Sequence, residues 1–379
     1  MLYRKMPRVK EELSILGFGC MRLPMRDGRI DELTAVRMMR TAIDNGINYI
    51  DTARPYHGGA SEPFVGRALK GLRDKVQLAT KLPSWMVKKR EDMDFHLDEQ
   101  LSQLQTDHID FYLLHALSTH RWENLLKLDV MDFMEKARAV GKIRYICFSF
   151  HDGLETFRKI VDAYAWDMCQ IQLNFLDDNF QAGLDGLHYA RGKEIGVVVM
   201  EPLKGGNLSV PIPEDLKETA QAADYDRPNL AELALRWIWH QPEVGLLLSG
   251  MSAPEQMDQN IASAAKGQMG NLNAKELELV NTTKALFTSR MRVPCTACAY
   301  CKPCPQGVDI SQCFSNLNNG AISGDWATQK ASYHYMLADD REGGKASACV
   351  ECGVCEPKCP QNIPIREKLK EVVVAFETA

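Results

Sequence analysis

The stretch INYIDTARPYHGGASEPFVGRALKGLRDKVQLATKL (residues 47–82) contains the pattern that decides the fold. Its two apolar runs, 47–53 and 76–82, have the length and composition of β-strands, and the segment 61–72 between them has the apolar spacing of an α-helix. Two consecutive strands joined through a helix form a βαβ unit, in which the strands run parallel. The stretch therefore predicts one unit of a parallel sheet that is covered by helices.

The same pattern recurs on both sides of this stretch. Strand starts lie roughly 30 residues apart, which is the length of one βα unit. Glycine follows several helical segments, at Gly46, Gly141 and Gly196, as a left-handed C-cap requires. Eight continuous apolar strands predict a closed (β/α)8 barrel. The alternative is a doubly wound open sheet, which would carry GxGxxG after a strand, and the sequence has no such motif there. The predicted strands are 15–21, 47–53, 76–82, 109–116, 143–150, 168–174, 197–203 and 244–250.

The longest interval between neighbouring strands follows the seventh strand. It contains KGGNLSVPIPEDLKETAQAADYDRPN (204–229), in which glycine, proline and acidic residues are frequent. This composition is typical of irregular connections. We expect a long loop after the seventh strand.

Length and charge narrow the class of protein. A chain of 379 residues exceeds one ordinary domain, and a barrel followed by a small second domain fits it. The net charge of −5 argues against a nucleic-acid partner, which would favour a basic face. The first residues lack the apolar core of a signal peptide, and no apolar run reaches membrane-spanning length. We expect a cytoplasmic protein with neither a membrane nor a nucleic-acid partner.

Four ionisable residues stand where three consecutive strands end. Asp51 ends the second strand, Tyr56 follows in its loop, Lys81 ends the third strand and His115 ends the fourth. The C-terminal ends of barrel strands meet at one mouth, where the chemistry of such barrels takes place. Each residue alone has a structural interpretation, as a helix cap, a surface lysine or a core histidine. Together they predict a proton-transfer site.

The segments that contain these residues resemble those of a known enzyme family. YIDTARPYHGGASEPFVGRALKGLR (49–73) resembles the signature of the aldo/keto reductases, and ATK (79–81) and YLLHA (112–116) resemble the segments with the family's other catalytic residues. The resemblance covers about residues 13 to 290. It implies an oxidoreductase that uses NADP or NAD to reduce an aldehyde, ketone or sugar-like carbonyl.

The resemblance implies a catalytic tetrad of Asp51, Tyr56, Lys81 and His115. Hydride transfer places negative charge on the carbonyl oxygen, so we expect Tyr56 to donate a proton to it. The ordinary pKa of a phenol is about 10, and the Lys81 ammonium would lower it by stabilising the phenolate. Asp51 would hold Lys81 charged and oriented. His115 would polarise the carbonyl by a hydrogen bond.

The resemblance also implies a nicotinamide site. Ser149 and Gln170 would bind the carboxamide, and Met200 stands where many relatives place a tyrosine that stacks on the ring. PLKGGNL (202–208) resembles a pyrophosphate-binding loop, and GMSAPEQMDQNI (250–261) resembles an adenosine-binding segment. An ordinary loop and an ordinary helix start are the alternatives for these two segments. The implied contacts are Ser149, Gln170, Met200, Leu203, Lys204, Gly206, Gly250, Gln256, Gln259 and Asn260.

The adenosine segment departs from one common family feature. Relatives that prefer NADPH often place arginine or lysine there to bind the 2′-phosphate. Here Met251, Ser252 and Gln256 are uncharged. Without a guanidinium fork we expect weak discrimination between NADPH and NADH.

The cysteines are unevenly distributed along the chain. Cys20, Cys147 and Cys169 lie in apolar segments and are expected to be buried, inert thiols, whereas the other nine of the 12 follow residue 290. CTACAYCKPCPQGVDI (295–310) and CVECGVCEPKCPQNIPI (349–365) both read C-x2-C-x2-C and then Cys-Pro. This repeated spacing is typical of cubane iron–sulfur clusters. Zinc is the alternative, because four-cysteine zinc sites also use C-x2-C pairs.

The tail resembles an α-helical dicluster ferredoxin, because the segments 312–323 and 327–340 between the repeats have a helical pattern. The whole chain resembles a subgroup of aldo/keto reductases that have such C-terminal domains. We therefore predict a barrel at 1–289 and an iron–sulfur domain at 290–379, with Cys313 left as a structural residue. In two-cluster ferredoxins the cysteine before proline binds the other cluster. This implies one [4Fe–4S] cluster on Cys295, Cys298, Cys301 and Cys359 and another on Cys349, Cys352, Cys355 and Cys304.

Three functions compete at this point. The first is a reductase acting on a small carbonyl or alcohol substrate. The second is an electron-transfer protein whose barrel binds nicotinamide or a partner, with a redox partner protein at the iron–sulfur domain. The third is a redox sensor. The complete tetrad favours the reductase, and no flavin signature is present to convert the two electrons of a hydride into the single electrons that a cubane accepts.

Overall fold

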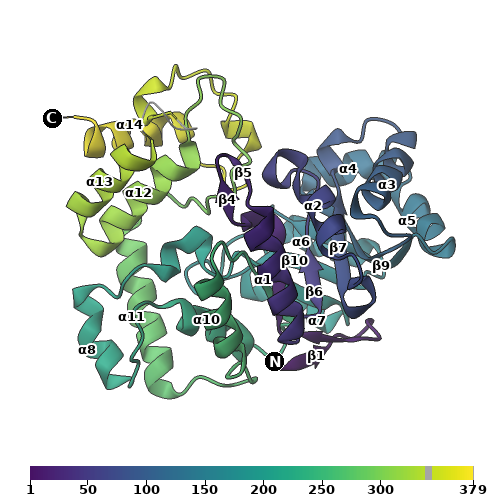
Figure 1. The fold of residues 1–379 in the computed structure, drawn as a ribbon, viewed down its shortest axis with the longest axis horizontal. Coiled ribbons are helices and arrows are strands. Elements are labelled where there is room, and N and C mark those ends of the chain that lie inside the picture. Colours follow the sequence, from purple (N-terminus) through teal and green to yellow (C-terminus); the bar gives the residue numbers. More distant parts are fainter. Residues whose placement is uncertain (338–343, 379) are drawn as a thin grey trace. The chain divides into compact units, whose positions relative to one another are not determined.

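The computed structural model describes residues 1–337 and 344–378. Eight parallel strands close into a barrel in the order β10-β11-β12-β3-β6-β7-β8-β9, which confirms the predicted fold class (Figure 1). All eight predicted strands are present. Their bounds are β3 (Leu16–Gly19), β6 (Tyr49–Asp51), β7 (Gln77–Leu82), β8 (Ile109–Leu117), β9 (Ile143–Phe150), β10 (Met168–Gln172), β11 (Gly196–Met200) and β12 (Leu246–Ser249).

The segments that follow the strands form helices, because their apolar residues recur on one face that packs on the barrel. In α1 (Glu32–Asp44), the side chain of Asp31 accepts a hydrogen bond from the Thr34 amide and caps the first turn, while Met38, Met39 and Ala42 are buried. The other helices that connect or follow barrel strands are α2 (Ser61–Ala68), α3 (Glu91–Leu104), α4 (Thr119–Lys127), α5 (Val130–Ala139), α6 (Leu154–Ala163), α7 (Gly183–Gly192), α9 (Ala231–His240) and α10 (Pro254–Ala264).

Two of the three predicted glycine C-caps are confirmed. Gly46 follows α1 with φ +91° and Gly141 follows α5 with φ +80°, both in the left-handed region. Gly196 is not such a cap, because it is the first residue of β11, and Glu194 takes the left-handed conformation after α7 instead, with φ +58°. A Cβ on Gly196 would lie 2.6 Å from the Met6 sulfur, so this glycine serves close packing.

An antiparallel hairpin of β1 (Tyr3–Lys5) and β2 (Glu12–Ser14) precedes the barrel and was not predicted. Met6 between its strands packs into one apolar cluster with residues at the starts of barrel strands, such as Phe111 and Met168. Figure 1 places β1 near the N-terminus, by the barrel strands. The hairpin therefore closes the end of the barrel opposite the strand C-termini.

A buried arginine fastens this hairpin. The guanidinium of Arg4 donates hydrogen bonds to the carbonyl oxygens of Trp239 at 2.5 Å, Val244 at 2.8 Å, Gly267 at 3.0 Å and Gln241 at 3.2 Å. Burial lowers the pKa of Arg4 to about 10. A charge this deep is retained because four carbonyl oxygens replace the water it has lost.

The prediction of a long loop after the seventh strand is wrong in part. A 3-10 turn, η5 (Lys204–Ser209), and a nine-residue helix, α8 (Glu214–Ala222), occupy the interval. Pro213 stands at the N-cap of α8, and the acidic residues of its first turn favour the positive end of the helix dipole. Leu216 and Ala220 are buried on one face. The turn residues on both sides obscured this short amphipathic helix.

The chain divides into two compact units. The first comprises Met1–Leu173, Asp177–Pro202 and Leu235–Asn271, and the second comprises Asn174–Leu176, Leu203–Ala234 and Leu272–Ala379. No helix among the described residues is long and apolar enough to cross a membrane.

The C-terminal part of the second unit is helical, as predicted. Its helices are α11 (Ala274–Arg290), α12 (Ile310–Ser323), α13 (Trp326–Met336) and α14 (Ile365–Phe376). Apolar residues such as Phe314, Tyr333 and Val372 form its core, and Cys313 is fully buried among them. Residues 338–340 of the predicted segment 327–340 lie outside the described residues. The domain limits 1–289 and 290–379 stay a prediction. Helix α11 continues across position 289 to Arg290.

Candidate functional site

Three of the four predicted tetrad residues share one hydrogen-bond network. The Lys81 ammonium, on β7, donates to both carboxylate oxygens of Asp51, the last residue of β6, at 2.7 Å each. It also donates to the Thr52 carbonyl oxygen at 2.8 Å and to the Tyr56 hydroxyl at 3.3 Å. The parallel register of β6 and β7 brings these residues to the same end of the barrel.

This network is almost completely shielded from solvent. Lys81 is 0% exposed and Asp51 is 2% exposed. Burial raises the pKa of Asp51 and lowers the pKa of Lys81, while the attraction between the two charges opposes both shifts. The pair therefore places the Lys81 nitrogen beside the Tyr56 oxygen in a place almost closed to solvent.

The fourth residue, His115, lies beside the same phenol. Its ring centroid is 6.3 Å from that of Tyr56, with the two rings nearly perpendicular. Its backbone carbonyl accepts a hydrogen bond of 2.6 Å from the Ser84 hydroxyl. Burial lowers the pKa of His115 well below its ordinary value, and the charges of Lys81 and Arg121 add to the shift. The imidazole is therefore neutral at pH 7.

A second buried carboxylate lies behind Lys81, and the sequence analysis missed it. The Glu62 side chain, on α2, accepts hydrogen bonds from the Thr80 hydroxyl at 2.5 Å and from the Gln100 amide at 2.6 Å. The Gln100 amide also donates to the Lys81 backbone carbonyl at 3.0 Å, and its own oxygen accepts from the Tyr112 hydroxyl. Burial raises the pKa of Glu62. Gln100 on the apolar face of α3 was the available signal.

The residues predicted to bind the carboxamide and ring of the nicotinamide lie on neighbouring strands. Ser149 of β9 pairs in register with Gln170 of β10. The Ser149 hydroxyl accepts from the Ala116 amide at 2.7 Å, and the Gln170 amide donates to the Met200 sulfur at 3.4 Å. Both Ser149 and Gln170 are 2% exposed. They therefore form one polar strip at the C-terminal ends of β9, β10 and β11.

The predicted adenosine segment begins directly after β12. The Asn260 amide, on α10, donates to the Ser249 hydroxyl at 3.0 Å, while Gln256 accepts from the Ser252 amide at 2.8 Å. Gln256 and Gln259 are exposed. The Arg22 side chain packs against Gly250, where a Cβ would lie 3.0 Å from it. Arg22 is thus a cation beside this segment that the sequence analysis did not identify.

The predicted pyrophosphate loop belongs to the second unit. Lys204 has φ +45° and Gly206 has φ +102°, and Leu203 precedes them. The Asn207 amide donates to the Lys204 carbonyl oxygen at 2.7 Å and to the Cys295 carbonyl oxygen at 3.4 Å. A Cβ on Gly205 would lie 2.5 Å from the Thr296 carbonyl oxygen. The loop therefore packs on the start of the first cysteine run.

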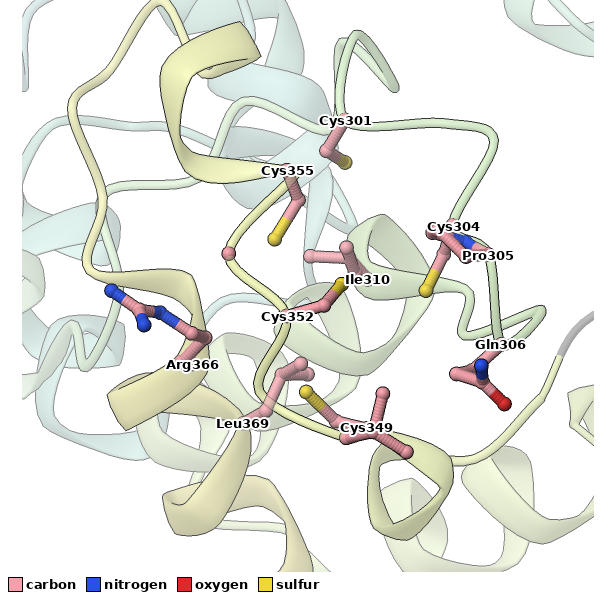
Figure 2. Close-up of a pocket in the computed structure, with 12 residues that line it drawn as sticks. Cys301, Cys304, Pro305, Gln306, Ile310, Cys349, Cys352, Cys355, Arg366 and Leu369 are labelled. Atoms are coloured by element: carbon pink, nitrogen blue, oxygen red, sulfur yellow. The ribbon is translucent and has the colours of Figure 1, made fainter.

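Cysteines of both runs surround one pocket in the second unit (Figure 2). Cys301 and Cys304 of the first run line this pocket together with Cys349, Cys352 and Cys355 of the second run. Burial raises the pKa of Cys355, and the nearby Cys349 and Cys304 thiols add to the shift. The side chains of Ile310 and Leu369 supply apolar walls, and Arg366 lies at one side.

Cys301 lies near two cysteines of the second run. Burial raises the pKa of Cys301 to about 12, and the neighbouring Cys359 and Cys355 thiols contribute to the shift. Within residues 1–337 and 344–378, no three histidine, cysteine or carboxylate side chains converge on a point where one metal ion could bind.

The three cysteines of the barrel are 0% exposed, so the prediction of buried thiols is confirmed. Cys20 lies near the Lys81–Asp51 pair, whose charges act on its thiol. Burial raises the pKa values of Cys20, Cys147 and Cys169. These thiols are therefore protonated and poorly reactive at neutral pH.

Comparison with known protein families gives two matches. The model of the aldo/keto reductase family matches residues 15–281, and the model of the 4Fe-4S dicluster domain matches residues 294–364. Among curated proteins, L-galactose dehydrogenase of Arabidopsis thaliana is 28% identical over 279 residues, covering 67% of this chain and 85% of that protein. The NADH-specific methylglyoxal reductase of Escherichia coli (strain K12) is 27% identical over 296 residues, covering 66% and 90%.

Solved structures with the same barrel include an aldo-keto reductase from Bacillus halodurans in its holo form. Its TM-score is 0.62 at 28% identity, and the match covers 74% of this chain and 96% of that chain. An aldo/keto reductase from Klebsiella pneumoniae in complex with NADP and acetate has a TM-score of 0.61 at 26% identity, with coverage of 74% and 95%.

The burial of His115 leads to a testable prediction. Its imidazole should stay neutral as the pH is lowered from about 8 to about 5, because burial and nearby cations disfavour the protonated form. Resonances of isotope-labelled histidine, assigned with His115→Gln, would follow this group. The exposed His120 serves as a reference in the same samples. A titration of His115 near its ordinary value of 6.5 would contradict the prediction.

Proposed function

This chain belongs to the aldo/keto reductase family, and from that premise we propose that it reduces an aldehyde, ketone or sugar-like carbonyl with NADH or NADPH. Members of the family are NAD(P)H-dependent oxidoreductases that act on small carbonyl compounds. One observation carries the proposal for this chain. The buried ammonium of Lys81 lies between the Asp51 carboxylate and the Tyr56 hydroxyl, which it contacts at 3.3 Å.

The proposed chemistry uses these residues for proton transfer. A bound reduced nicotinamide supplies a hydride to the carbonyl carbon. As negative charge grows on the carbonyl oxygen, Tyr56 donates its hydroxyl proton to that oxygen, and the product is an alcohol. Lys81 stabilises the phenolate that remains, and Asp51 keeps Lys81 charged and oriented.

His115 has a different role in this proposal. Because its imidazole is neutral, it can donate a hydrogen bond to the carbonyl oxygen without itself transferring the proton. Glu62 and Gln100 are positioning residues, since they fix the β7 backbone at Lys81 and do not reach the reacting atoms. Exclusion of water from this buried group strengthens its electrostatic effect on the developing charge.

We propose that the polar strip of Ser149 and Gln170 binds the carboxamide, with Met200 against the nicotinamide ring. Lys204 and the neighbouring glycines would hold the pyrophosphate, and the α10 residues Gln256, Gln259 and Asn260 would bind the adenosine. The structures of Klebsiella pneumoniae relatives with NADP and NADPH support a dinucleotide in this barrel.

In the second unit we propose two [4Fe–4S] clusters with crossed ligation. The match to a 4Fe-4S dicluster domain supports the clusters, and the meeting of cysteines from both runs around one pocket supports the closeness of the runs that the crossing requires. A cluster accepts single electrons when bound. The dicluster domain also favours a second candidate function, electron transfer to a redox partner protein with nicotinamide bound in the barrel.

The proton-donor assignment predicts the effect of Tyr56→Phe. This variant should lower kcat for carbonyl reduction by about 10²- to 10⁴-fold, the usual contribution of a positioned acid, with little change in nicotinamide affinity. Tyr189→Phe, the same substitution on α7, is the matched control. Steady-state kinetics and cofactor titration measure both effects. Undiminished kcat in Tyr56→Phe would favour the electron-transfer function instead.

The lack of arginine and lysine in the adenosine segment predicts comparable affinities for the two cofactors. The dissociation constants of NADPH and NADH, measured by fluorescence titration, should differ by less than about a hundredfold, which corresponds to about 2.7 kcal/mol. A larger preference for NADPH would show that a cation outside positions 251–256 binds the 2′-phosphate. Arg22→Gln would then test the arginine that packs against Gly250.

The cluster assignment predicts about eight irons per chain in protein prepared without oxygen, which is two cubanes. Cys359→Ser should disturb the cluster of the first run, and Cys304→Ser the cluster of the second run, as followed by iron content and electron paramagnetic resonance. Cys313→Ser is the matched control, because this buried cysteine lies outside both runs. Stoichiometric zinc without iron would contradict the clusters. Two clusters that survive both ligand substitutions unchanged would contradict the crossing.

A further inference from the structure

Two side chains extend the site beyond His115, at the same mouth of the barrel. Trp85, in the 3-10 turn η4 (Ser84–Met86) after β7, has its ring centroid 5.0 Å from that of His115. The Arg121 guanidinium, on α4 after β8, lies over the Trp85 ring at 5.3 Å from its centroid. Tyr56, His115, Trp85 and Arg121 thus form a continuous series of contacts within the first unit.

The position of Arg121 is defined by the backbone. Its guanidinium donates a hydrogen bond of 2.7 Å to the carbonyl oxygen of Ala116, the residue after His115. The stack on Trp85 and this hydrogen bond together orient the planar fork, which reduces the entropy lost when it binds a ligand. Trp85 is 40% exposed, so an apolar surface beside this fork is accessible from solvent.

Several other ionisable groups lie at this mouth of the barrel. The Lys81 ammonium is balanced by Asp51, and burial keeps His115 neutral. Burial also lowers the pKa of His151, the next group near Arg121, to about 4, so that it too is neutral at pH 7. Asp152 accepts hydrogen bonds from the Thr119 and Gly153 amides. Arg121 therefore contributes a cation next to an exposed aromatic ring.

We propose that Arg121 and Trp85 form the outer part of the substrate site and select a carbonyl compound with an oxoanion, a carboxylate or phosphate, at the end remote from the carbonyl. This rests on the proposed reductase function. The carbonyl lies at Tyr56 and His115, the connecting ring or chain covers Trp85, and the oxoanion accepts from the Arg121 fork. A 2-oxo acid does not meet this arrangement, because its carboxylate adjoins its carbonyl.

The test compares aromatic aldehydes of one shape. In the full-length protein, 4-formylbenzoate, 4-formylphenyl phosphate and the neutral 4-formylbenzamide are assayed for kcat/KM with NADPH. Their dissociation constants are measured calorimetrically with NADP⁺, so that binding is read without turnover. A charge-assisted pair with Arg121 should favour at least one anion over the amide by about tenfold or more. The stronger of the two anions distinguishes a carboxylate from a phosphate substrate.

Arg121→Gln should bring the anion-to-amide ratio close to one in both measurements. Arg158→Gln should keep the wild-type ratio, since Arg158 stacks on Tyr189 at the same 5.3 Å but on the outer helices. Arg121→Lys, which keeps the charge and loses the fork, should lower the ratio, and it provides the test where Arg121→Gln does not fold.

The outcomes separate the two proposals. Equal affinities for anion and amide in the wild type, or an anion preference that persists in Arg121→Gln, would overturn the oxoanion site. A preference for the anion in binding that depends on Arg121, without reduction of any of the three aldehydes, would support the oxoanion site and overturn the reductase function.

Discussion

The buried ion pair between Lys81 and Asp51 is the interaction on which the site depends. Moving two charges out of water costs several kcal/mol for each ion, and only good geometry offsets that loss. Lys81 meets this condition with bonds to both Asp51 oxygens, the Thr52 carbonyl and the Tyr56 hydroxyl. The end of β6 and the segment after it supply all four acceptors, and the adjacent parallel strand β7 supplies the donor. The same bonds that stabilise the buried ammonium therefore fix the phenol beside it.

In the proposed mechanism the surroundings of this pair decide which group transfers a proton. Glu62 and Gln100 anchor the β7 backbone from behind, while burial and nearby cations keep His115 neutral in front. In the proposed mechanism the neutral His115 imidazole donates a hydrogen bond, whereas the Tyr56 phenol, which contacts the Lys81 ammonium, donates the proton. On the open side, Trp85 and Arg121 add an aromatic surface and a positive charge. In our two proposals the mouth has a reacting end and a recognition end.

The second unit combines two features that lie far apart in the chain. The 204–209 turn packs on the start of the first cysteine run, through Asn207 and the close approach of Gly205 to Thr296. The two cysteine runs in turn meet around one pocket, with Ile310 and Leu369 as its walls. A segment that follows a barrel strand therefore shares its packing with cysteines that the family match assigns to a dicluster domain.

The sequence by itself determined the architecture, because the alternation of apolar runs with amphipathic segments and the paired cysteine spacings are local patterns. The eight strands, the helical tail and the positions of Asp51, Tyr56, Lys81 and His115 at strand ends followed from it. The tertiary structure alone decided which distant side chains touch. Glu62 with Gln100, Arg121 on Trp85 and Cys304 among the second cysteine run are contacts between separate elements. Helix α8 was hidden because burial of Leu216 and Ala220, which no local pattern reveals, outweighs its turn-like flanks.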